Sequence, residues 1–158
     1  MRKTLIIIGV TAAAGLAAAI PSHAQAPAQP PFNPSFGDLM NMLVQSRHAK
    51  LGIAGREQNW PLAAYAVHEL KDALEKIAHL KPRFRNYSVA DMMASTVDAP
   101  ITAIEQATKA QDANGFAAAY ARLTDGCNSC HVALNHPFVV IKAPDQSSFP
   151  NQEFRAAK

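Results

Sequence analysis

The sequence predicts an all-α fold, an up-down-up-down four-helix bundle with an extended C-terminal tail. Apolar residues recur every three or four positions in four separate stretches, which is the spacing of one helix face. Residues that cap helices stand before these stretches, and the connections are short and rich in polar residues or proline. Because short connections join antiparallel neighbours, successive helices are expected to run in alternating directions.

The first two helices have clear boundary signals. The first is expected over residues 35–55, with Ser35 or Asp38 as its N-cap. The second follows an N-cap at Asn59 and carries a regular apolar stripe. It is expected to stop before Pro82, because proline disfavours helix at the residue that precedes it.

The middle of the sequence is divided by Pro100. Residues 81–87 are expected to form a loop with local positive charge, and Ser88 resembles the first residue of a capping box. Because Pro100 interrupts the pattern, we expect a short helix at 89–97 and a third bundle helix at 99–111.

The fourth helix and the tail follow. A tight turn at 112–115 leads into a helix that is expected from Phe116 to about Leu134. Residues 138–141 are apolar and could pass for a strand, but no second strand is available to pair with them. The tail, 137–158, is therefore expected to be extended and either packed on the bundle or disordered.

The N-terminus has the pattern of a signal peptide over residues 1–24. Arg2 and Lys3 form a basic start, residues 5–20 are apolar or small, and a small-x-small pattern ends at Ala24. The alternative is a retained membrane anchor, but 16 residues are fewer than the roughly 20 that a bilayer span needs. The sequence therefore predicts cleavage after Ala24 and a periplasmic location, without stable membrane insertion of the mature chain.

The mature chain is expected to consist of three parts: a Pro-rich tether at 25–34, a helical domain at 35–136 and the tail at 137–158. Cleavage removes two of the 15 Lys and Arg and none of the 12 Asp and Glu, so the formal net charge falls from +3 to +1. This near-neutral balance does not indicate a nucleic-acid-binding protein.

The only two cysteines lie in the motif C-x-x-C-H, formed by Cys127, Cys130 and His131. This motif is typical of covalent attachment of haem c, in which each sulfur forms a thioether with the porphyrin and the histidine binds iron as the proximal ligand. The spacing of three and four residues from Leu123 places the motif on the apolar face of the fourth helix.

Three other interpretations of the cysteines compete with haem attachment. A thioredoxin-like dithiol normally follows a strand, which is not predicted before Cys127. A zinc site that includes His136 would have adjacent ligands at Cys130 and His131, which chelate poorly. A short-loop disulfide is compatible with an exported protein. Haem attachment agrees best with the motif, the export signal and the helical context.

Four helices with C-x-x-C-H near the end of the last one resemble the class II c-type cytochromes, the cytochrome c prime and cytochrome c-556 group. The resemblance covers about residues 35–135 and implies a bundle that encloses one haem. It also implies that homodimers can form. Two departures stand out: Asn135 replaces the basic residue that usually follows the haem histidine by four positions, and 27 residues follow His131.

The sixth iron ligand is expected from the first helix, whose N-terminal half lies beside the end of the fourth in an antiparallel bundle. Met40 or Met42 is preferred to His48, which lies about 12 Å farther along the helix. The alternatives are that the methionines fill the core, that His48 faces solvent, and that the sixth position is open or holds water.

We expect an electron-transfer protein that exchanges single electrons with redox partner proteins and is not an enzyme. No catalytic arrangement of side chains is evident in the sequence. The alternative is a protein that binds or senses a small gas, NO or CO, as the resemblance to cytochrome c prime implies. A peroxidase-like enzyme is less well supported, because no distal His and Arg pair is evident.

Overall fold

Four long helical stretches make up most of the described structure, which in this computed structural model comprises residues 32–156. The fold is therefore all-α, as the sequence predicts. The expected signal peptide at 1–24 and tether residues 25–31 lie outside the described residues. Among the described residues, no helix is both long enough and apolar enough to cross a membrane.

The first stretch contains α1 (Phe36–Leu39), the π-helical segment η1 (Met40–Gln45) and α2 (Ser46–Arg56), which follow without a break. Ser35 starts it with a capping box: its hydroxyl oxygen accepts from the Asp38 backbone N–H at 3.1 Å, and the Asp38 carboxylate accepts from the Ser35 N–H at 2.9 Å. The predicted helix is confirmed. Its π-helical segment was not predicted, because apolar spacing alone does not distinguish i+4 from i+5 hydrogen bonding.

The second stretch is α3 (Trp60–Leu80). The Asn59 side chain accepts a hydrogen bond from the Leu62 N–H at 3.2 Å, so the predicted cap is confirmed. Residues 81–87 are not entirely loop, because β1 (Arg83–Phe84) pairs antiparallel with β2 (Tyr87–Ser88). Strands of two residues are too short for alternation to reveal them.

The expected break at Pro100 is wrong. The third stretch contains α4 (Val89–Met93), the π-helical segment η2 (Ala94–Asp98) and α5 (Ala99–Ala110), which are continuous. A proline removes one α-helical hydrogen bond and crowds the carbonyl four residues earlier, here Thr96. The wider π-helical turn directly before α5 accommodates Pro100, and the Asp98 side chain makes no cap hydrogen bond.

The fourth stretch, α6 (Ala113–Ala133), begins three residues earlier than expected. The Asp112 carboxylate accepts hydrogen bonds from the N–H groups of Asn114 and Gly115 at 3.1 and 3.0 Å. Gln111, with φ of 55°, supplies the left-handed residue that ends α5. The turn is therefore shorter than the predicted 112–115, because the capping carboxylate lies at its start.

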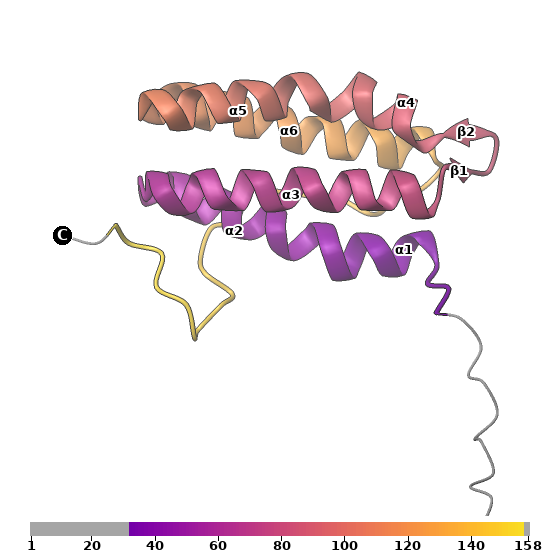
Figure 1. Cartoon of the computed structure of the whole chain (residues 1–158), viewed down its shortest axis with the longest axis horizontal. Helices are drawn as coiled ribbons and strands as arrows, with labels where there is room; N and C mark the ends of the chain where they lie inside the picture. Colours follow the sequence, from indigo (N-terminus) through magenta and orange to yellow (C-terminus); the bar gives the residue numbers. More distant parts are fainter. Residues whose placement is uncertain (1–31, 157–158) are drawn as a thin grey trace, which may run out of the picture. The chain divides into compact units, whose positions relative to one another are not determined.

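The helices pack in a closed series: α2 contacts α3, α3 contacts α5, α5 contacts α6, and α6 contacts α2. Figure 1 shows two layers, α5 with α6 and α3 with α1 and α2. The main core lies between them, and its fully buried side chains include Leu51, Leu70, Ile104 and Leu123. A second cluster is centred on Leu39, Ile77 and Val89.

Gly126 brings α6 against η2. A Cβ atom at position 126 would overlap the Thr96 carbonyl oxygen, so this glycine permits close approach of the two backbones. We expect Gly126→Ala to lower the free energy of unfolding by about 1–3 kcal/mol, measured by urea unfolding. Gly37→Ala is the control, since a Cβ there meets only Ser35 Oγ at 3.9 Å. Equal stability of the two variants would contradict the expectation.

Candidate functional site

The C-x-x-C-H motif lies on the last turns of α6, where Cys127, Cys130 and His131 are each half-buried. Tyr120 and Leu123, which precede the motif at helical spacing, are buried in the core. The motif therefore shares the inward face of α6 with core residues, as the sequence predicts. Both cysteine thiols are free, so the structure does not contain the short-loop disulfide.

The surroundings of the two thiols disfavour the thiolate form on which a redox dithiol depends. Burial, together with a smaller contribution from the neighbouring Cys130, raises the pKa of the Cys127 thiol to about 11. Burial also raises the pKa of Cys130. Dithiol oxidoreductases depend on a lowered pKa that yields thiolate near neutral pH. The thioredoxin-like interpretation therefore finds no support in this environment.

His131 has one ring nitrogen engaged and the other available. Its Nδ1 lies 2.8 Å from the backbone carbonyl oxygen of Val139. A carbonyl oxygen can only accept, so Nδ1 carries the proton and donates. The Nε2 atom of the neutral ring then has a free lone pair, which is the state of a histidine that binds a metal.

Val139 reaches His131 because the chain reverses directly after α6. Asn135 adopts the left-handed conformation, with φ of 63°, and the His136 N–H donates to the His131 carbonyl oxygen at 2.8 Å. Residues 136–141, here called the return segment, then run back along α6. Asparagine suits position 135, since it tolerates the left-handed conformation better than most residues.

A second attachment holds the far end of the return segment. The Asn128 side chain donates from Nδ2 to the Ile141 carbonyl oxygen at 2.9 Å, and its Oδ1 accepts from the Ile141 N–H at 2.7 Å. The amide thus pairs with both backbone groups of one residue. Asn128 is the first spacer residue of the motif, and no local sequence pattern predicts this role.

Aromatic contacts place the start of the first helix near the end of α6. The rings of Phe36 and Phe84 are 4.8 Å apart, those of Phe84 and His136 6.4 Å, and those of His136 and Phe138 5.6 Å. Phe84 therefore bridges α1 and the return segment at one end of the helices. This agrees with the antiparallel arrangement on which the choice of a sixth ligand depends.

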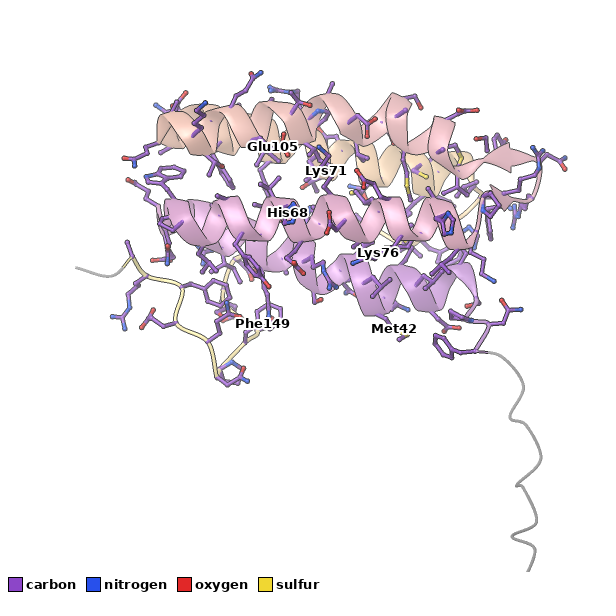
Figure 2. All side chains as sticks on the ribbon, in the orientation of Figure 1. Met42, His68, Lys71, Lys76, Glu105 and Phe149 are labelled. Atoms are coloured by element: carbon purple, nitrogen blue, oxygen red, sulfur yellow. The ribbon has the colours of Figure 1, made fainter. Side chains whose placement is uncertain are left out.

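The two candidate methionines differ in environment. Met42 is 56% exposed, and Figure 2 shows it on the outer edge of its helix. Met40 is half-buried and packs against the second core cluster. Met93, which sequence analysis did not consider, packs against both clusters. The sequence did not predict the packing of Met93, because it predicted two separate helices where the structure has one continuous stretch.

His48 is buried, so the interpretation that it faces solvent is wrong. The Thr124 hydroxyl donates to the Tyr120 carbonyl at 3.0 Å, so the Thr124 oxygen accepts from His48 Nε2 at 3.1 Å. His48 Nδ1 lies 3.0 Å from the Tyr120 hydroxyl, which is 2.9 Å from the His48 carbonyl oxygen. Burial lowers the pKa of His48 to about 4, which favours the neutral ring, and the single proton of the Tyr120 hydroxyl serves either Nδ1 or the His48 carbonyl oxygen.

The other histidines and acidic residues do not form a metal cluster in the described part of the chain. Within residues 32–156, no three or more His, Cys, Asp or Glu side chains are grouped so as to hold a metal ion. His68, labelled in Figure 2, is exposed, and its Nε2 lies 3.8 Å from Oδ2 of Asp72 on the same helix.

Comparisons with known proteins add no assignment. No protein-family model, no curated protein and no solved structure matches the chain. The fold and site therefore define a class of structure only: an all-α domain whose last long helix carries a C-x-x-C-H motif with two free thiols.

Proposed function

We propose that this chain is a c-type cytochrome of the class II kind, a four-helix bundle that carries one covalent haem and transfers single electrons in the periplasm. Cys127 and Cys130 would hold the haem by thioethers, and His131 Nε2 would bind the iron. The bound group supplies a one-electron iron couple. The observation that carries the proposal is the His131 hydrogen bond to Val139, which leaves Nε2 available on the residue directly after Cys130, while both thiols of the motif are free.

The polypeptide would contribute binding, orientation and exclusion of water. The thiols are placed three residues apart on the inward face of α6, and the half-buried apolar cluster that includes Met40, Leu43 and Met93 provides apolar surface at the end of the helices near the return segment. An apolar surrounding limits solvent access to a metal centre and so affects its reduction potential.

A direct test is to produce the full chain in a bacterium that attaches haem c. We expect a red periplasmic protein whose mass exceeds that of the polypeptide cleaved after Ala24 by one haem. The absorption spectrum of the denatured protein in alkaline pyridine identifies haem c. A colourless product with the mass of the bare polypeptide would contradict the proposal.

Among the candidate sixth ligands, the surroundings favour Met40. Met42 is exposed, and His48 would have to give up a hydrogen bond inside the core before it could bind iron. We expect Met40→Leu to convert the low-spin spectrum of the oxidised protein into a high-spin one. Loss of the methionine ligand should also lower the reduction potential, so that the oxidised form is favoured. Met42→Leu, the matched control on the same helix, is expected to leave the spectrum unchanged.

The second candidate function is binding or sensing of NO or CO. It is favoured by the surroundings of two candidate ligands: Met42 is exposed and His48 is hydrogen-bonded in the core, so the sixth position would be open if Met40 does not bind the iron. If the wild-type protein is high-spin and binds CO when reduced, the gas-binding function is supported. A low-spin spectrum that CO does not alter would exclude it.

A further inference from the structure

We propose that the return segment, residues 136–141, is a device that positions His131, and that Asn128 holds it in place. The inference rests on the proposed haem attachment and deepens it. It assigns a role in the iron site to Asn128, a spacer residue of the motif, and to a part of the chain that lies beyond the last helix.

The first step is the hydrogen bond between His131 Nδ1 and the Val139 carbonyl oxygen, at 2.8 Å. A hydrogen bond from this nitrogen fixes the orientation of the ring, selects the form with Nε2 free, and increases the electron-donating strength of Nε2. A more strongly donating ligand stabilises the oxidised iron relative to the reduced iron. The Val139 carbonyl would therefore lower the reduction potential.

The second step is that a carbonyl in a segment without secondary structure needs its own support. Val139 and Val140 lie in residues with no helix or strand, and Phe138 and Val140 are mostly exposed, so apolar burial does little to hold this part of the segment. Two sets of hydrogen bonds support it instead. The Val139 N–H donates to the His136 carbonyl at 3.0 Å, and the Asn128 amide pairs with Ile141.

The third step is the geometry of that pairing. Asn128 donates to and accepts from the same residue, at 2.9 and 2.7 Å, which fixes Ile141 in both position and orientation. Asn128 lies on α6 only three residues before His131. The helix that presents the histidine therefore also holds, two residues beyond Val139, the segment whose carbonyl orients it.

The test uses the full haem-bound protein and three variants. Asn128→Ala removes the side-chain amide. Ile141→Pro removes the backbone N–H that donates to Asn128 Oδ1, and the proline side chain is still apolar. Ser129→Ala is the matched control, since the other spacer residue is exposed and bonds only to the Asp125 carbonyl of its own helix, at 2.8 Å. Ile141→Pro lies outside the motif, so it remains informative if Asn128→Ala impairs haem attachment.

We expect Asn128→Ala and Ile141→Pro each to shift the reduction equilibrium toward the reduced form by up to about tenfold. For a one-electron couple this is a rise in reduction potential of about 59 mV. Ser129→Ala should keep the wild-type potential. Independently of the potential, amide hydrogen exchange at Ile141 should be about tenfold faster in Asn128→Ala than in the wild type.

The possible results separate this inference from the proposed function. A wild-type protein that carries haem, with unchanged potentials in Asn128→Ala and Ile141→Pro, would overturn the positioning role alone. An equal shift in Ser129→Ala would also overturn it, because the effect would then belong to the motif in general. A wild-type protein without haem would overturn both proposals.

Discussion

Replacing both Cys127 and Cys130 by serine is expected to abolish the covalent haem completely. A serine hydroxyl does not form the thioether, and these are the chain's only two cysteines. The purified double variant should be colourless after denaturation and extraction, and its mass should equal that of the polypeptide. Each single variant should retain at most one covalent link and give a lower yield of coloured protein.

The control for this result is Ser129→Ala, which alters the same motif without removing a thiol. It is expected to mature to the same mass and colour as the wild type. Circular dichroism of the double variant distinguishes loss of haem attachment from loss of secondary structure. A double variant that still carries covalently bound haem would contradict the assignment of both cysteines.

Sequence alone predicted the helices where the chain carries local signals. Asn59 caps α3 as expected, because an N-cap with proline two residues later is a signal confined to a few positions. Pro100 misled the prediction, since a proline ends most helices. The π-helical segment η2, which accommodates Pro100, packs against α6 at Gly126. This packing joins parts of the chain about 30 residues apart, so no local pattern predicts it.

The candidate site was also predicted only in part. The motif identified Cys127, Cys130 and His131 because their spacing is itself the signal. The partners of His131 and Asn128 lie 8 and 13 residues farther along the chain, and they meet only because the chain reverses at Asn135. Similarly, nothing near His48 in the sequence indicates that Tyr120 and Thr124, more than 70 residues away, surround it.

The burial of His48 should make the protein's stability depend on pH between about 6.5 and 4. In the unfolded chain this histidine takes up a proton as the pH falls through about 6.5, whereas the folded structure holds the pKa of His48 at about 4. The unfolded state therefore binds more protons in this range, and stability falls as the pH falls. The loss attributable to His48 amounts to about 3 kcal/mol once the pH is below 4.

Urea unfolding of the wild type and of His48→Gln at pH 7, 6, 5 and 4 measures this contribution. Glutamine does not titrate and can still donate to Thr124, so the difference between the two proteins should shrink steadily toward low pH. The carboxylates with lowered pKa values, such as Asp38 and Glu153, are common to both proteins and cancel in the comparison. His68→Gln should follow the wild type throughout, because His68 is exposed. Parallel stability curves for the wild type and His48→Gln would show that folding does not lower the pKa of His48, and the burial of a neutral ring between α2 and α6 would be contradicted.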